Sequence, residues 1–214
     1  MTTTAVILLV AAGVAATIDW WSVATDRLGV EFLAKPAVII CLIGVALAIE
    51  IDPGGASNVE RSILLVALGA SLVGDVVLMT PDARFEAGLG AFLVAHLFYI
   101  AALAPDFEVG VGLIAAILIV ALGFGVVPQL LGAVRAHGAA ITAAVAAYVV
   151  VVSVMGIVAA GTGLVVTAIG GALFVVSDAL LGWGRFVGPA PGGRVLVHVT
   201  YHLGQAGLVL WLAA

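Results

Sequence analysis

Residues 139–160 read AAITAAVAAYVVVVSVMGIVAA, and none of these side chains carries a charge. An α-helix needs about 20 apolar residues to cross the hydrocarbon core of a bilayer. The stretch lacks the alternation of apolar and polar residues that marks the strands of an outer-membrane barrel. It therefore predicts a transmembrane helix, and the same pattern recurs along the chain in both directions.

The composition of the whole chain agrees with a membrane protein. Apolar residues make up 64% of the 214 residues and charged residues only 9%, whereas soluble domains are roughly half apolar and a quarter charged. So few charges cannot cover the surface of a soluble protein of this size. A net charge of −5 without a basic run excludes nucleic acid as a partner. The single cysteine, Cys41, lies within an apolar run, which excludes a disulfide framework and a Cys-based zinc site.

We expect an all-α protein with a single transmembrane domain, residues 1–214, built as a bundle of eight helices. The first segment lacks the positively charged start of a signal peptide, so we expect a retained helix that ends at the interfacial pair Trp20 and Trp21. Turn residues fill the connections, as in Asp52-Pro53-Gly54-Gly55 and Thr80-Pro81-Asp82. The apolar runs place the helices at about residues 5–19, 36–51, 62–80, 87–104, 110–127, 139–160, 163–183 and 195–213.

The cations indicate how the bundle is oriented in the membrane. With eight helices, the odd-numbered connections share one side, and six of the seven Lys and Arg residues fall on or beside them. These six are Arg27, Lys35, Arg84, Arg135, Arg185 and Arg194, while Arg61 falls on the side of the two termini. Lys and Arg are enriched in cytoplasmic connections. Both termini are therefore expected on the non-cytoplasmic side.

Several polar side chains lie inside the expected helices, where burial is costly and function is the usual reason for it. They are Ser71 and Asp75 in the third helix, His96 and Tyr99 in the fourth, Tyr148 in the sixth, Ser177 and Asp178 in the seventh, and His198, Tyr201, His202 and Gln205 in the eighth. At about 1.5 Å of rise per residue, Asp75, Asp178, Tyr201, His96 and Gln205 fall roughly 6–15 Å below the cytoplasmic edge. This shared depth predicts one polar cavity in the cytoplasmic half.

Structural roles are the alternative for each of these residues. A buried aspartate can accept a hydrogen bond from a neighbouring hydroxyl, and His96 can donate a hydrogen bond to another helix. The serines can form hydrogen bonds with the backbone of their own helices. Tyr99 and Tyr148 are more often packing residues, and His198 lies near enough to the interface to be solvated. The spacing of His198 and His202 lets two imidazoles share a metal ion, but two histidines alone are a weak signal. We expect no metal and no cofactor.

Four ordered motifs resemble the YhhN-like family of integral-membrane lysoplasmalogenases. The first is Lys35-Pro36, and the second runs from Ser71-Leu-Val-Gly-Asp75 to Phe85, Gly88, Phe92, His96 and Tyr99. The third is Gly171-Ala-Leu-Phe174-Val-Val-Ser177-Asp178, and the fourth is Tyr201 with Gln205. The resemblance covers the chain from about residue 35 to its end. His202 departs from the family pattern, which often has an aromatic residue there, and this argues against a required histidine metal site.

The resemblance implies a membrane hydrolase that cleaves the vinyl-ether bond of a lysoplasmalogen, a lysophospholipid, with water. The products would be a fatty aldehyde and a glycerophospho-base, and the enzyme would be an integral protein of a bacterial cell membrane. Protonation of the vinyl β-carbon creates an oxocarbenium ion that water attacks, so the reaction needs an acid and a second group that activates water or stabilises the cation. Two carboxyls in a low-dielectric cavity rarely ionise together.

We therefore expect Asp75 and Asp178 to form the catalytic pair, without assigning which of them is the acid. His96 is expected to join them as a catalytic residue that orients water or substrate. The expected substrate-binding residues are Lys35, Ser71, Tyr99, Ser177, Tyr201 and Gln205. Lys35, at the mouth of the cavity on the end of the second helix, would receive the phosphate.

Two other functions use the same kinds of residue. Membrane-embedded Asp and His also form the proton relays of transporters, and Asp75 and Asp178 occupy corresponding third helices of the two halves. Against a transporter, the halves show no internal repeat of the kind that many carriers have. A metal-dependent amidase-like hydrolase is the third possibility.

The orientation can be tested with reporter fusions. We expect a C-terminal alkaline phosphatase fusion to be active, because that enzyme folds only outside the cytoplasm and the cations place the terminus there. A silent phosphatase fusion, together with an active cytoplasmic reporter at the same position, would reverse the orientation and the depths derived from it.

Overall fold

The computed structural model describes residues 1–51, 55–80 and 85–214 of the chain. Within these ranges, eight helices are long and apolar enough to cross a membrane, and the predicted all-α class is confirmed. They are α1 (Thr3–Ala24), α2 (Leu28–Ala48), α3 (Asn58–Met79), α4 (Phe85–Leu103), α5 (Val109–Val134), α6 (Ala139–Gly161), α7 (Val165–Phe186) and α8 (Gly193–Leu210). The 3-10 turns Ala104–Asp106, Arg135–His137 and Trp211–Ala213 extend α4, α5 and α8.

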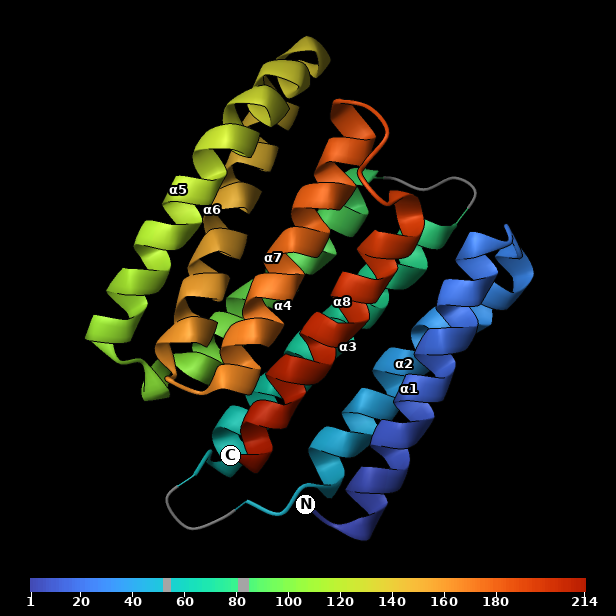
Figure 1. Cartoon of the computed structure of the whole chain (residues 1–214), viewed down its shortest axis with the longest axis vertical. Helices are drawn as coiled ribbons and strands as arrows, with labels where there is room; N and C mark the ends of the chain where they lie inside the picture. The colour runs from blue at the N-terminus through green and yellow to red at the C-terminus, as the bar shows by residue number, and fades with distance from the viewer. Residues whose placement is uncertain (52–54, 81–84) are drawn as a thin grey trace.

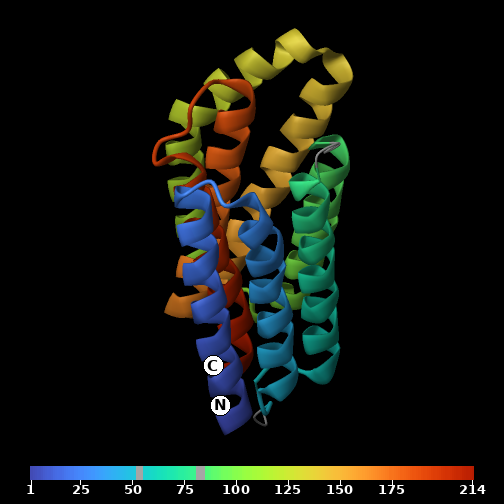
Figure 2. The same ribbon diagram turned by 90° about the vertical axis from the view of Figure 1, so that its right-hand side faces the viewer.

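Consecutive helices pack as antiparallel pairs, α1 with α2, α3 with α4, α5 with α6, and α7 with α8. In Figure 1 the α5–α6 pair lies at one side of the bundle and the α1–α2 pair at the other, with α3, α4, α7 and α8 between them. Both termini lie at the same end, as Figures 1 and 2 show. The connections α1–α2, α5–α6 and α7–α8 lie at the opposite end, as an eight-helix topology requires (Figure 1).

Three helices begin or end well away from their predicted boundaries. One is α5, whose predicted end is at about residue 127 and which continues through Pro128 to Val134. The other two lie on either side of the first connection. α2 begins at Leu28, so Lys35 and Pro36 lie within the helix instead of opening it. α1 continues past Trp20 and Trp21 to Ala24. The differences in α1 and α2 arise because charged residues and a proline between residues 20 and 36 resemble a connection. A proline removes only one helical hydrogen bond, and Glu31 and Lys35 are paired with Arg194 and Asp75 of other helices. The predicted turns at Asp52–Gly54 and Pro81–Asp82 lie outside the described residues.

The charged end of the bundle has the composition that the sequence predicts. Arg27, Arg135, Arg185 and Arg194 are at or near the helix ends opposite the termini, and Lys35 lies about two turns further in. Arg61 lies near the start of α3, at the end of the termini. Arg84 lies outside the described residues. The orientation of this end relative to the cytoplasm stays a prediction.

Glycines bring the backbones of α7 and α8 into direct contact. A Cβ atom on Gly207 would lie 2.6 Å from Cα of Gly170 and 2.9 Å from the carbonyl oxygen of Val166, and one on Gly204 would lie 2.9 Å from the amide nitrogen of Phe174. Such close approach between membrane helices requires small residues. The crossing holds Ser177 and Asp178 of α7 beside the start of α8.

We expect Gly207→Ala to destabilise the protein, because the new methyl group has backbone atoms on two sides and overpacking costs about 1–3 kcal/mol. Gly13→Ala is the matched control, since nothing lies within 4 Å of a Cβ at that position. Thermal unfolding in detergent, followed by size-exclusion chromatography, should give a lower midpoint for Gly207→Ala alone. Equal midpoints for both variants would show that the α7–α8 crossing is looser than described.

Candidate functional site

A polar cavity of about 470 Å³ opens among the helices at the end opposite the termini. Its walls come from α2, α3, α7 and α8, with Phe92 of α4 at the inner side. Both predicted aspartates, Asp75 and Asp178, line it. The other charged or hydroxyl-bearing residues of its wall are Glu31, Lys35, Ser177, Arg194, His198 and Tyr201.

Asp75 is completely buried on α3, where it meets α2 and α8. The hydroxyl of Tyr201 donates a hydrogen bond of 2.7 Å to Oδ2, and the ammonium of Lys35 lies 3.0 Å from Oδ1. Lys35 also lies over the Tyr201 ring, 5.4 Å from its centroid. The three side chains form a compact unit, in which an ion pair and a hydrogen bond compensate for the removal of the carboxylate from water.

This arrangement corrects the predicted position of Lys35. The sequence pattern placed it at the end of a helix, with its charge free for a phosphate. Instead its Nζ faces Asp75 and only 11% of its side chain is exposed. Because α2 begins at Leu28, Lys35 lies inside the bundle and not at the rim.

Asp178 on α7 has different partners from those of Asp75. The hydroxyl of Tyr148 on α6 donates to its Oδ2 over 2.8 Å, and Nε2 of His96 on α4 lies 3.3 Å from the same oxygen. Nδ1 of His96 is 2.6 Å from the carbonyl oxygen of Phe92. A carbonyl can only accept, so Nδ1 carries the hydrogen and Nε2 of a neutral ring is an acceptor. A hydrogen bond between Nε2 and Asp178 therefore requires a proton on one of them.

Two further predicted residues lie deeper in the bundle, outside the cavity lining. Tyr99 and Gln205 are fully buried, and the hydroxyl of Tyr99 donates to Oε1 of Gln205. Phe174, also fully buried, packs edge-on against His96 at a ring distance of 4.8 Å and against Tyr201 at 5.4 Å. Phe174 also packs against Tyr99 at 6.0 Å, so these side chains form one buried cluster next to His96 and Tyr201, which contact the two aspartates.

The two serines have separate environments. Ser177 lines the cavity, and its hydroxyl donates to the carbonyl oxygen of Val197, which ties α7 to α8. Ser71 is fully buried, and its oxygen has no hydrogen-bond partner among the described residues. Of the predicted substrate-binding residues, Lys35, Ser177 and Tyr201 line the cavity, whereas Ser71, Tyr99 and Gln205 lie outside its lining.

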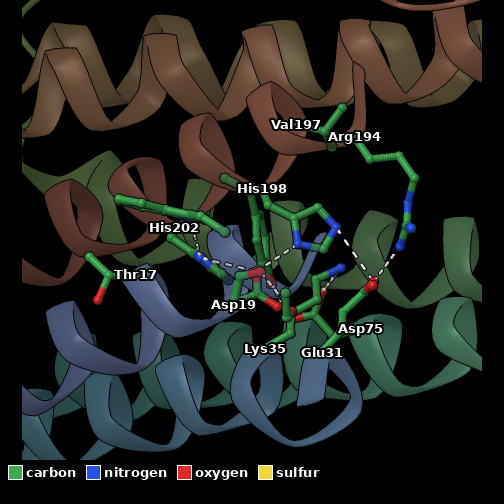
Figure 3. A network of polar contacts seen from close by, with 12 residues as sticks. Thr17, Asp19, Glu31, Lys35, Asp75, Arg194, Val197, His198 and His202 are labelled. Atoms are coloured by element: carbon green, nitrogen blue, oxygen red, sulfur yellow. Dashed lines mark hydrogen bonds and ion pairs between the residues drawn. The ribbon is translucent and has the colours of Figure 1, made fainter. Parts of the chain in front are cut away.

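A second group of charged side chains adjoins Asp75, and the sequence pattern did not predict it. Asp19 of α1 is fully buried, and its Oδ2 lies 2.7 Å from Nδ1 of His198 and 3.9 Å from Nδ1 of His202. Glu31 of α2 pairs with Arg194 at the start of α8. Figure 3 shows Asp19 facing both histidines and Glu31 between His198 and Arg194.

Three sequence-based readings change in consequence. His198 is buried and paired, not solvated. Trp20 also has a contact inside the bundle, since its Nε1–H donates to Nδ1 of His202 over 3.1 Å. Tyr148 is more than a packing residue, since it donates to Asp178. Asp19 could have been predicted as a site residue, because it is a carboxylate within an apolar run. Glu31 could not, because its segment resembles a connection between helices.

Both histidines of α8 lie near Asp19, but His198 Nδ1 is 2.7 Å from its Oδ2 and His202 Nδ1 is 3.9 Å away and accepts from Trp20. His198 is directed to Asp19 and Glu31, and His202 to Trp20. Within the described ranges, no three His, Cys, Asp or Glu side chains form a group that could hold a metal ion. The cavity thus has two carboxyls on its wall. Asp75 is paired with the cation of Lys35, and Asp178 lies beside His96 and the phenol of Tyr148.

Comparisons with known proteins agree with the motifs. The model of the YhhN family matches residues 30–212. The chain is 32% identical to the pig (Sus scrofa) protein named lysoplasmalogenase TMEM86B over 178 residues, which cover 79% of this chain and 71% of that protein. It is 32% identical to the mouse (Mus musculus) protein of the same name over 85% of this chain and 74% of that protein. The human (Homo sapiens) protein of that name is 28% identical over 83% of this chain and 73% of that protein. No solved structure matches the chain.

We expect the purified protein to contain no stoichiometric transition metal, because the histidines are already engaged with protein side chains. Elemental analysis of detergent-purified protein measures this directly, and vinyl-ether hydrolysis should persist after treatment with a chelator. Loss of hydrolysis on chelation, its recovery with zinc, and its absence in His202→Ala would together establish a metal site.

Proposed function

The chain belongs to the YhhN family, and on that premise we propose that it is a membrane-embedded lysoplasmalogenase. The reaction hydrolyses the vinyl-ether bond of a lysoplasmalogen and releases a fatty aldehyde and a glycerophospho-base. The observation that supports it best is the pair of carboxyls, Asp75 and Asp178, on the wall of one cavity within the helices. The curated relatives carry the name of this activity.

We assign the acid to Asp178. Its Oδ2 lies 3.3 Å from the His96 nitrogen that has no hydrogen of its own in the neutral ring, and in our proposal one proton shared by this pair is the proton that is transferred. In the first step this proton goes to the vinyl β-carbon, and the π electrons of the double bond form the new C–H bond. The carbon next to the ether oxygen then becomes an oxocarbenium centre.

In this mechanism Asp75 acts as the ionised carboxylate, and Asp178 acts as the acid. Lys35 forms an ion pair with Asp75 and Tyr201 donates to it, so both side chains hold the carboxyl in place and favour its ionised form before substrate binds. A fixed negative charge stabilises the developing cation and accepts a proton from the attacking water. In the resulting hemiacetal the C–O bond to the glycerol breaks as Asp75 passes its proton to the glycerol oxygen. The hydroxyl proton of the hemiacetal returns to the Asp178–His96 pair as the aldehyde forms. One water is consumed and no net proton is released.

The mouth of the cavity suits a zwitterionic headgroup. Lys35 is engaged with Asp75, so we propose that Arg194, whose side chain is 54% exposed, contacts the phosphate. Its partner Glu31 then faces the amine of the headgroup. The cations around this end also support placing it at the cytoplasmic surface, with both termini on the other side of a cell membrane.

A proton-coupled transporter is the alternative, and it is not favoured. The paired aspartates would suit a proton relay, but the relatives that cover most of the chain carry the name of a hydrolase. Aldehyde release by purified protein in detergent tests hydrolysis without any transport, and its absence under all conditions would remove the proposed function.

We expect Asp178→Asn and Asp75→Asn each to lower turnover at least about a hundredfold, the lower range for loss of a general acid or base. The amide keeps the size of the side chain and removes its proton equilibrium. Asp106→Asn is the control, because Asp106 accepts a hydrogen bond from Trp211 at the other end of the bundle. The measurement is aldehyde release from a vinyl-ether lysolipid.

The double variant should be little slower than the slower single variant, since residues that act as one unit are not additive. Size-exclusion profiles must show that each variant is folded. Near-normal turnover in either folded single variant would remove that aspartate from the mechanism.

A further inference from the structure

A second cavity, of about 340 Å³, lies on the other side of Asp178. It is enclosed by α4, α5, α6 and α7, and Leu78 of α3 closes one end. Its wall is apolar except for Asp178, Tyr148 and Ser153. We call this space the chain groove. Apolar residues that define it include Leu89, Ile119, Leu122, Val126, Val152 and Val175.

The chain groove and the polar cavity meet at Asp178. Asp178 lines both spaces, as do Leu78, Phe92 and Leu181. The Tyr148 hydroxyl, which donates to Asp178, belongs to the wall of the chain groove. Asp178 therefore stands at the boundary between a charged compartment and an apolar one, where a molecule with one polar and one apolar end would place its junction.

The outer wall of the chain groove faces lipid. It is formed by α5, the least buried of the eight helices, and Leu122 on this wall is 76% exposed. In our inference a hydrocarbon chain would enter the groove from the bilayer at this exposed wall, without passing through the polar cavity. Gly123 of α5 and Gly182 of α7 also line the groove. As glycines, they have no side chain that could fill it.

We propose that the chain groove binds the alkenyl chain of the substrate, with the vinyl-ether group at Asp178 and the headgroup in the polar cavity. This inference rests on the proposed function, and it identifies the position of the substrate within that site. Its occupant is a single hydrocarbon chain, because the groove continues from the proposed acid and is lined by apolar side chains.

The groove acts mainly by positioning. A substrate dissolved in a bilayer is already in an apolar medium, so moving its chain into the groove gains little from the hydrophobic effect. What the groove supplies is a fixed depth and orientation of the β-carbon against Asp178, which proton transfer to carbon requires. A side chain that fills the groove would therefore displace long chains more than short ones.

The test uses Gly123→Leu and Gly182→Leu, which narrow the groove from opposite walls. A Cβ at Gly123 would meet only Val127 Cγ2, at 3.6 Å, and one at Gly182 only Leu130, at 3.5 Å or more, so both substitutions begin in ordinary contact. Gly125→Leu is the matched control, because Gly125 lies on α5 outside the groove lining and a Cβ there meets nothing within 4 Å.

Aldehyde release is measured with hexadecenyl and octenyl vinyl-ether lysolipids that share one headgroup. We expect the ratio of kcat/KM for the long chain over the short chain to fall at least about tenfold in both groove variants, the effect of modest overpacking. The ratio for Gly125→Leu should match that of the unmodified protein. An unchanged ratio in folded groove variants of an active enzyme would overturn the inference and leave the proposed function intact.

A second measurement needs no variant and no turnover. An alkyl-ether lysolipid, which lacks the reactive double bond, carries a photoreactive diazirine at the end of its chain and is cross-linked to the unmodified protein. Labelled peptides from α5 and α6 are expected, and labelling confined to α1 and α2 would overturn the inference. If the protein instead releases no aldehyde from either chain length, the proposed function fails, whatever the labelling shows.

Discussion

Four carboxylates buried among membrane helices impose the main constraint on this protein. Each would be costly in hydrocarbon without a partner, and each has one from another helix. Asp19 faces His198, Glu31 faces Arg194, Asp75 faces Lys35 and Tyr201, and Asp178 faces Tyr148 and His96. Removing one partner of such a pair leaves an uncompensated buried charge. The pairs therefore fix which helices are neighbours and how each is rotated.

Helix α8 has a central place in this arrangement because it supplies partners to three of the four carboxylates. Arg194, His198 and Tyr201 all lie in its first half. Its position depends on the glycine contact with α7, where the two backbones meet without side chains between them. The close crossing thus keeps the carboxyl-bearing face of α7 and the donor-bearing face of α8 on the same cavity. Packing and charge compensation support each other here.

The sequence predicts the eight helices well, because their apolar runs match the thickness of a bilayer. It also predicts Asp75, Asp178, His96 and Tyr201 as residues that come together, because a polar group in an apolar run is conspicuous. It does not reveal Glu31 or the inward direction of Lys35, since the charges and Pro36 around them resemble a connection. Nor does it reveal that Tyr148 meets Asp178. That contact depends on how α6 and α7 are rotated against each other, which periodicity within one helix does not determine.

The position of Asp178 between two unlike compartments also bears on what happens after bond cleavage. The polar cavity lies toward one end of the helix bundle, and the chain groove is walled by α5, the least buried of the eight helices. Hydrolysis at their junction would divide the molecule into a water-soluble fragment on one side and a fatty aldehyde on the other. Each fragment would then leave into the phase that dissolves it. Under the proposed function the two products would enter water and bilayer separately and would rarely meet again at the enzyme, so their separation would oppose the reverse reaction.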